Sequence, residues 1–378
     1  MSYRVCHVTS AHPRYDIRIF QKECRTLAAV YTTSLVVADG KGDEQLHGVA
    51  IYDAGKPKGR RERILNGPRM VLAKAFDVDA DVYHLHDPEL LRIVGALKRK
   101  GKKVIFDAHE DLPKQILSKP WISAVLRYPI SWLAYLYERA VLRKVDAVVA
   151  ATPAIGKKFQ SWGLRTSVVN NYPFISELAN DTPSNEKPSP PTLCYVGGIT
   201  AIRGIEYMTE ALALLSENHR VLNLAGPFDE EPTRTKVRAM HGFRKVNELG
   251  VLSRTEVAKL MAESRAGLVT FLPVPNHLEA QPNKMFEYMS AGLPVICSDF
   301  PLWRDLIERH RCGLCVDIRN PQSLADAIRY IFDHPKEAGE MGKRGRLAVS
   351  EECNWERESA ELLALYASIH LPKKETHG

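Results

Sequence analysis

The sequence lacks several features that would assign a protein to a class at once. Its seven cysteines follow no regular spacing, so we expect no disulfide framework and a reducing, cytoplasmic setting. No run of 18 apolar residues occurs, and MSYRVCHVTS at the start has no export signal. Cys312 and Cys315 form a lone Cys-x-x-Cys pair without a second ligand pair, which indicates a buried strand rather than a zinc site.

The charge balance is mildly basic. Lys and Arg number 52 against 45 Asp and Glu, a formal charge of +7. This favours anionic partners such as phosphates or acidic lipid headgroups, and does not by itself indicate nucleic acid. The length of 378 residues favours two domains, each with its own core.

Short apolar stretches alternate with longer stretches of helical spacing. This pattern predicts an α/β fold in which parallel sheets are covered by helices on both faces. We predict a first domain over 1–172, a linker over 173–191 that contains five prolines, and a second domain over 192–350. The expected strands lie at 4–8, 34–38, 81–85, 103–107 and 146–150, then at 192–196, 220–226, 266–271, 293–298 and 312–317.

The stretch CYVGGITAIRG (194–204) opens the second domain at a strand-to-helix junction. Gly197 and Gly198 would let backbone amides approach a ligand, and Arg203 stands where a helix begins. Since the spacing is neither GxGxxG nor a P-loop, no dinucleotide fingerprint is present. We favour a phosphate site here over a tight turn with a solvated arginine.

The stretch HLEAQPNKMFEYMSAG (277–292) predicts a helix over 282–291, with proline at its first position and glycine after its end. Asn283 and Lys284 would then lie in the first turn, where free amides favour an anion. Glu287 lies about one turn further, roughly 5 Å along the axis, within reach of ribose hydroxyls. Glu279 precedes the helix. The alternative is an exposed Lys284–Glu287 pair of little consequence.

Two expected strand ends in the first domain carry histidines, in YHLHDPE (83–89) and FDAHEDLP (106–113). One interpretation is a metal site made by His84, His86, Asp87 and His109. The other is that one histidine serves a ligand site while the others pack, with Asp87 as a helix cap.

The loop SAHPRYDIRIF (10–20) carries Arg14, Asp16 and Arg18. These side chains would bind a polar or phosphorylated acceptor, or alternatively pair with one another. Aromatic residues gather over 114–145, and basic runs occupy 56–63 and 98–103. Together these segments indicate either contact with an acidic membrane surface or an ordinary packed helix beside solvated loops.

The sequence resembles the family-4 (group 1) glycosyltransferases, which are retaining enzymes of the GT-B fold, and within them the bacterial branch of surface-polysaccharide assembly. The resemblance implies two doubly wound Rossmann-like domains facing across a cleft, with the segment 351–371 forming a helix that crosses back to the first domain. It is carried by the stretches 7–28, 84–91, 106–113, 195–204 and 282–301, by Trp355-Glu356, and above all by the E-x7-E pair of Glu279 and Glu287.

The resemblance also implies residue roles. Glu287 would hold the ribose, Glu279 and His109 would contact the donor sugar, and Asn283 and Lys284 would lie near the diphosphate. Arg203 stands where the family usually has a lysine that neutralises this diphosphate. The catalytic set is then Glu279, His109 and Arg203, while Gly197, Gly198, Arg203, Asn283, Lys284 and Glu287 bind the donor. Gly198 departs from many members, which have an arginine there.

The expected reaction moves a hexosyl-type sugar from a nucleoside diphosphate sugar to a saccharide or lipid-linked saccharide, with retention and without a metal. The acceptor hydroxyl would attack from the front face, and the donor phosphate would take its proton. The alternatives are a metal-dependent hydrolase using His84, His86 and His109, a GT-B-type UDP-sugar epimerase, or an inactive nucleotide-sugar-binding partner. We expect the protein in the cytoplasm, at the inner face of the membrane.

Overall fold

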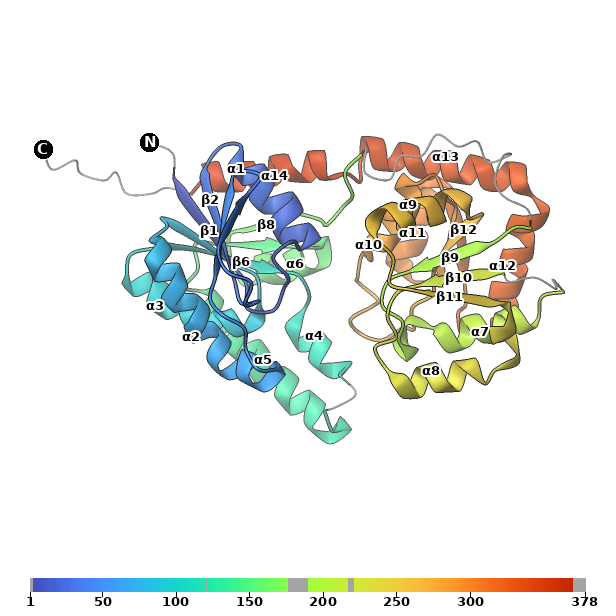
Figure 1. Cartoon of the computed structure of the whole chain (residues 1–378), viewed down its shortest axis with the longest axis horizontal. Helices are drawn as coiled ribbons and strands as arrows, with labels where there is room; N and C mark the ends of the chain where they lie inside the picture. The colour runs from blue at the N-terminus through green and yellow to red at the C-terminus, as the bar shows by residue number, and fades with distance from the viewer. Residues whose placement is uncertain (1–2, 120–121, 176–189, 217–220, 370–378) are drawn as a thin grey trace, which may run out of the picture. The chain divides into compact units, whose positions relative to one another are not determined.

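The computed structural model describes residues 3–119, 122–175, 190–216 and 221–369. The chain divides into two compact units (Figure 1). The first unit comprises Met1–Asn171 and Arg357–Gly378, and the second comprises Tyr172–Glu356. Each unit is an α/β domain built on its own sheet.

The first unit is built on an eight-stranded sheet of order β3-β4-β2-β1-β5-β6-β7-β8. All neighbouring strands are parallel except the edge pair β3–β4. The central strands are buried along almost their whole length, as expected for a parallel sheet covered on both faces. The strands are β1 (Arg4–Val8), β2 (Thr32–Val37), β3 (Glu44–Leu46), β4 (Val49–Asp53), β5 (Val82–Leu85), β6 (Lys103–Ala108), β7 (Ala147–Ala150) and β8 (Thr166–Val168).

Helices cover both faces of this sheet. One face carries a large apolar core under α2, η2, α3 and α6, and the other carries a smaller apolar core under η1. The helix α14, which has residues in both units, contributes Tyr366 to the first unit, where its hydroxyl meets His84. The helices are η1 (Ile17–Cys24), α1 (Arg25–Ala28), α2 (Arg60–Val78), η2 (Pro88–Ile93), α3 (Val94–Arg99), α4 (Leu112–Leu117), α5 (Ala124–Leu142), α6 (Pro153–Ser161) and α14 (Trp355–Ala367).

The second unit has a six-stranded, all-parallel sheet of order β11-β10-β9-β12-β13-β14. Separate apolar cores fill its two faces, and Figure 1 shows α7 and α9 on opposite sides of the sheet. The strands are β9 (Leu193–Val196), β10 (Leu222–Ala225), β11 (Val246–Gly250), β12 (Ala266–Val269), β13 (Val295–Ser298) and β14 (Gly313–Val316). The helices are η4 (Ala201–Arg203), α7 (Ile205–Ala213), α8 (Glu231–Arg238), η5 (His241–Lys245), α9 (Arg254–Glu263), α10 (Asn283–Ser290), α11 (Pro301–His310), α12 (Pro321–Asp333) and α13 (Pro335–Glu351).

The predicted α/β class with two doubly wound sheets is confirmed. The helix predicted over 282–291 is one residue shorter at each end, because Pro282 is the N-cap and Ala291 the C-cap of α10. Most of the predicted linker, 176–189, lies outside the described residues. Cys315 lies in β14 and Cys312 is buried just before it, both as free thiols. None of the helices in the described ranges is long and apolar enough to span a bilayer.

The expected strands omitted β4, β8 and β11. Two further features of the first unit were not predicted. The first is the antiparallel edge strand β3, which is only three residues long. The second is η1, an eight-residue π-helix. Such helices are rare and occur often at functional sites.

Candidate active site

The turn after β9 contains two adjacent glycines, Gly197 and Gly198, which have no side chains of their own. Gly197 has a φ of +113°, which disfavours any residue with a Cβ. A Cβ on Gly198 would lie 2.8 Å from Nη1 of Arg203 and 3.0 Å from a carboxylate oxygen of Asp229. The Arg203 guanidinium therefore occupies the space beside the turn, and its Nη1 donates to the carbonyl of Gly198 at 2.8 Å.

Lys284, in the first turn of α10, reaches the same turn. Its Nζ would lie 3.4 Å from a Cβ on Gly197, and it lies 3.5 Å from the centroid of the Tyr195 ring. The residue is only 8% exposed, and Nζ has no hydrogen-bond partner in the described part of the chain. Burial and the charge of Arg203 lower the pKa of Lys284 well below its usual value. A bound anion would offset both effects.

The remaining predicted donor-binding residues lie on α10 or just before it. Glu287 accepts an ion pair from Arg254, with Nη1 and Oε1 2.8 Å apart, so the exposed Lys284–Glu287 pair considered as an alternative is not what forms. Asn283 is exposed at the start of α10. Glu279 is exposed in the preceding turn, which Trp303 anchors by donating from Nε1 to the carbonyl of Ala280 at 2.7 Å.

The sheet of the first unit has a cavity of about 460 Å³ beside the carboxyl ends of its central strands. His109 follows β6 and lines this cavity, as do His12, Glu89 and Glu110. His109 Nε2 lies 3.1 Å from Asp107 Oδ2 and 3.2 Å from His86 Nδ1. The ring is thereby held at the cavity wall by buried neighbours.

Asp87 organises the first loop instead of capping η2. Its Oδ2 accepts hydrogen bonds from the amide of Ser10 at 2.6 Å and from the hydroxyl of Thr9 at 2.8 Å. Its Oδ1 lies 3.0 Å from His12 Nδ1. Burial disfavours charge on both partners, but their mutual interaction prevails, so the pKa of His12 is raised and that of Asp87 is lowered.

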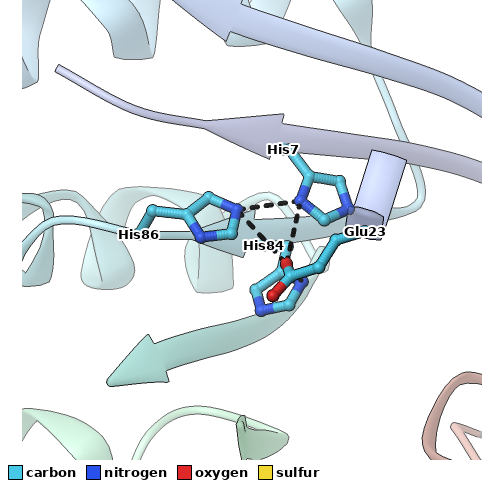
Figure 2. A group of neighbouring side chains, drawn as sticks. All are labelled: His7, Glu23, His84 and His86. Atoms are coloured by element: carbon cyan, nitrogen blue, oxygen red, sulfur yellow. Dashed lines mark hydrogen bonds and ion pairs between the residues drawn. The ribbon is translucent and has the colours of Figure 1, made fainter. Parts of the chain in front are cut away.

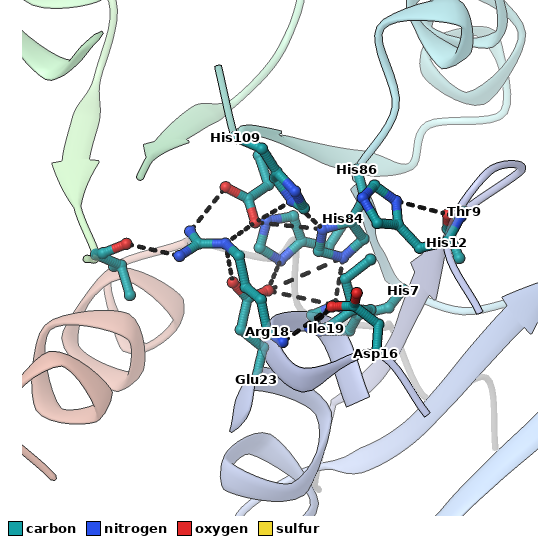
Figure 3. Close-up of polar contacts among 12 residues, drawn as sticks. His7, Thr9, His12, Asp16, Arg18, Ile19, Glu23, His84, His86 and His109 are labelled. Carbon is teal, nitrogen blue, oxygen red and sulfur yellow. Dashed lines mark hydrogen bonds and ion pairs between the residues drawn. The ribbon is translucent and has the colours of Figure 1, made fainter. Parts of the chain in front are cut away.

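The three residues predicted for the acceptor are engaged inside the first unit, and Figure 3 shows two of them, Asp16 and Arg18. Arg18 forms a bidentate pair with Asp107 at 2.9 Å for both contacts, and Asp16 caps η1 by accepting from the amides of Arg18 and Ile19. Arg14 pairs in the same way with Asp39. Both arginines are 3% exposed. Their carboxylate partners, Asp39 and Asp107, lie outside the loop, so the alternative in which the loop residues pair with one another at the surface does not describe them.

The four residues considered as one metal site separate into different clusters. His84 and His86 lie with His7 and Glu23 (Figure 2), whereas His109 lies with His86 and Asp107. Asp87 belongs to neither cluster. His7 and Glu23 were missed because they are distant in sequence from the His-x-His motif. His7 could have been found, because it is a histidine within the first expected strand, next in the sheet to the strand that carries His84.

The helix α5 exposes an apolar face. Its buried positions include the polar residues Ser131 and Glu138, while large apolar side chains face solvent. This is the reverse of the usual arrangement for a helix on a soluble domain. The segment 112–145 contains six Lys or Arg residues and one acidic residue, Glu138, which is itself paired with Lys158. The exposed apolar residues are Val125, Leu126, Tyr128, Ile130, Trp132, Leu133, Leu136 and Tyr137.

Comparison with known proteins places both units among glycosyltransferases. Residues 21–171 match the model of Glycosyltransferase Family 4, and residues 190–334 match that of Glycosyl transferases group 1. The D-rhamnosyltransferase WbpZ of Pseudomonas aeruginosa is 26% identical over 279 residues, which cover 70% of this chain and 68% of that protein. The alpha-D-kanosaminyltransferase of Streptomyces kanamyceticus is 24% identical over 48% of this chain and 46% of its own length.

The fold is shared with solved structures at low sequence identity. Sucrose-phosphate synthase from Thermosynechococcus elongatus has a TM-score of 0.79 at 18% identity, over 97% of this chain and 98% of that one. HepE of Anabaena, solved in complex with UDP-glucose, has a TM-score of 0.73 at 15% identity, over 97% of this chain and all of that one.

Proposed function

Because the chain is a group 1 glycosyltransferase of the GT-B fold, we propose that it transfers a hexosyl-type sugar with retention from a nucleoside diphosphate sugar. The acceptor is a saccharide or lipid-linked saccharide in the synthesis of bacterial exopolysaccharide, capsule or O antigen. The D-rhamnosyltransferase of Pseudomonas aeruginosa supports a sugar-transfer role of this kind. HepE, solved with UDP-glucose, supports a nucleotide-sugar donor.

The observation that carries this proposal is the buried Lys284 ammonium group beside Arg203 and the glycine turn. When the bond between the anomeric carbon and the diphosphate breaks, negative charge develops on the leaving phosphate. Two cationic side chains, already in place and partly shielded from water, stabilise that charge strongly. They supply this stabilisation without a metal ion, and we propose that the transfer step is metal-independent.

The other donor contacts follow from the resemblance. Glu287 would bind the ribose, which requires that its carboxylate share or leave its pair with Arg254. Asn283 would contact the diphosphate from the start of α10. Glu279 and His109 would contact the transferred sugar. The acceptor oxygen attacks the anomeric carbon as the phosphate departs, and its proton passes to a phosphate oxygen.

The acceptor is proposed to bind in the cavity of the first unit. Its lining mixes carboxylates, histidines and an arginine, including Glu89, His12 and Arg63, which are hydrogen-bonding groups suited to sugar hydroxyls. Arg18 would support this site indirectly, because its guanidinium is paired with Asp107, which lines the cavity. Arg14 is paired with Asp39, which is not among the lining residues.

We also propose that the first unit contacts the acidic inner surface of the cytoplasmic membrane through α5. Aromatic and aliphatic side chains on its exposed face would enter the interface, and the surrounding cations would meet lipid phosphates. The enzyme would then bind a lipid-linked acceptor at the membrane surface.

The experiment is a thermal-unfolding panel with UDP-, GDP-, ADP- and dTDP-sugars, followed by NMR of the product with the stabilising donor. A ligand that binds the native state raises the unfolding temperature. We expect one nucleotide class to stabilise the protein and the product to keep the donor's anomeric configuration. Inverted product would refute retention. Conversion of the sugar without an acceptor would support the epimerase instead.

A further inference from the structure

The centre of one sheet face in the first unit is polar where an apolar core would be expected. His7 on β1 and His84 on β5 are register partners on adjacent parallel strands. His86 lies two residues beyond His84 and therefore points to the same face. Glu23 reaches this face from η1, which covers it. All four side chains are fully or almost fully buried, and Figure 2 shows them gathered in one group.

Their side-chain atoms converge on one point. Glu23 Oε2 lies 3.7 Å from His7 Nδ1, 3.9 Å from His84 Nδ1 and 3.9 Å from His86 Nε2. These distances exceed those of hydrogen bonds. Two ligands that each lie about 2.0–2.2 Å from one zinc ion are separated by roughly 3–4 Å. His7 Nδ1 and His86 Nε2 are closer, at 2.8 Å, and share a hydrogen bond that metal binding would replace.

Hydrogen bonding within the described residues leaves this cluster unsatisfied. Glu23 Oε2, the oxygen on which the three histidines converge, has no hydrogen-bond partner there. Glu23 Oε1 is the oxygen that faces Arg18, with Nε 3.0 Å away. A buried carboxylate oxygen without a donor is costly, by about 1–3 kcal/mol or more, so its retention calls for another partner.

The helix η1 is shaped to bring Glu23 to this position. Residues five apart lie roughly 140° apart around an α-helix and could not share one face. In the π-helical η1, Arg18 and Glu23 are five apart, yet both point into the same buried cluster. The unusual winding is thus what places the fourth side chain opposite the three histidines.

We propose that His7, Glu23, His84 and His86 bind one first-row transition-metal ion of the Zn²⁺ type, as a structural centre of the first domain. Three imidazole nitrogens and one carboxylate oxygen form a ligand set suited to such an ion. Four protein ligands without solvent access leave no open position for a reacting molecule, which is typical of structural sites.

The surroundings support the ligand atoms. His86 Nδ1 lies 3.2 Å from Asp107 Oδ2, which gives the carboxylate–histidine–metal arrangement common around bound metals. The Tyr366 hydroxyl lies 2.9 Å from His84 Nδ1, and metal binding would exchange this hydrogen bond for a metal bond. The neighbouring cluster of His86, Asp107 and His109 is the weaker candidate, because Arg18 already occupies both oxygens of Asp107.

The experiment measures the metal content of the full-length protein. The chain is expressed in medium supplemented with Zn²⁺, passed over a chelating resin and measured by plasma mass spectrometry. We expect about one ion per chain, and far less in Glu23→Gln and His84→Asn. His109→Gln and His12→Gln are matched controls that should retain the ion. Loss of the ion in His109→Gln with retention in Glu23→Gln would place it in the other cluster and overturn the proposal.

A second measurement does not depend on variants that might not fold. The wild-type protein is stripped with a strong chelator and reloaded with Co²⁺, whose visible absorption reports its coordination. We expect a saturable spectrum at about one equivalent and a higher unfolding temperature after reloading. Metal content below about 0.1 ion per chain, with no effect of added Zn²⁺ or Co²⁺ on unfolding, refutes the metal site.

Discussion

Lys284 Nζ lies 3.5 Å from the centroid of the Tyr195 ring, and no described oxygen accepts a hydrogen bond from it. The cation–π contact holds the ammonium group against β9, while Arg203 adds a second positive charge nearby. The two positive charges of Lys284 and Arg203 repel each other. A diphosphate in front of the glycine turn would relieve that repulsion.

The first prediction concerns the affinity for the donor nucleotide. Lys284→Met should weaken binding of the stabilising nucleotide diphosphate by about 1.5–3 kcal/mol, or roughly 10- to 150-fold in Kd, because a charge-assisted contact is lost. Isothermal titration calorimetry measures this change. Lys236→Met, at a side chain that is 62% exposed, is the matched control and should bind normally. Equal affinities for the two variants would remove Lys284 from the donor site.

The second prediction tests the glycine turn. Gly198→Ala should displace the Arg203 guanidinium, because the new Cβ would lie 2.8 Å from its Nη1. We expect a loss of donor affinity with an unfolding temperature close to that of the wild type, since a flexible side chain can move aside. Gly95→Ala is the control, as a Cβ there meets nothing within 4 Å. If Gly198→Ala binds the donor as tightly as Gly95→Ala does, the position of the Arg203 guanidinium does not contribute to donor affinity.

The third prediction concerns stability. Arg18→Met removes the guanidinium that Asp107 and Glu23 share, and leaves Asp107 with only His86 and His109 as side-chain neighbours. It should lower the free energy of unfolding by about 3–5 kcal/mol. Adding Asp107→Asn should recover part of this loss, because both charges are then gone. Urea unfolding of the wild type, the two single variants and the double variant measures the four free energies of this double-mutant cycle. For comparison, Arg309→Ala breaks an exposed pair with Asp305 and should cost about 0–1 kcal/mol. A purely additive double variant would mean that the two groups do not interact.

The fourth prediction is a pH dependence of the His12–Asp87 pair. The pKa of His12 is raised above its ordinary value of 6.5, so its stabilising contribution is fully present below that value and is lost as the pH rises through the raised pKa. The pKa of Asp87 is lowered, so Asp87 stays ionised and the ion pair remains intact as the pH falls into the acidic range. The difference in unfolding free energy between wild type and His12→Gln should therefore be largest below the ordinary histidine pKa of 6.5 and shrink as the pH rises above it. A difference that stays constant would show that His12 carries no charge in this range.

The fifth prediction addresses the membrane. Trp132→Glu places a carboxylate in the middle of the apolar face of α5, at a position 61% exposed. It should reduce cosedimentation with vesicles rich in anionic lipid while leaving nucleotide affinity unchanged. Leu347→Glu, at an exposed position in the second unit, serves as the control. Vesicle binding by Trp132→Glu at the wild-type level would assign the contact to another surface.

Local pattern was sufficient to predict the fold class and the parts of the donor site that lie close together in sequence. Apolar strands and helical spacing repeat over a few residues, so the two sheets could be predicted. Gly197, Gly198 and Arg203 belong to one turn, and Lys284 and Glu287 to one helix. The contact between Lys284 and the Gly197 turn could not be predicted in this way. It depends on the strand order of the sheet, which places β9 beside β12.

The tertiary structure decided the partners of the charged side chains. Sequence order cannot reveal that Arg18 pairs with Asp107, or Glu287 with Arg254, since these contacts join distant segments. The position of Glu23 depended on a π-helical turn that no local signal marked. Short-range periodicity thus determined the elements and their order, whereas pairing across adjacent strands and a rare helical winding brought His7, Glu23, His84 and His86 to one buried point.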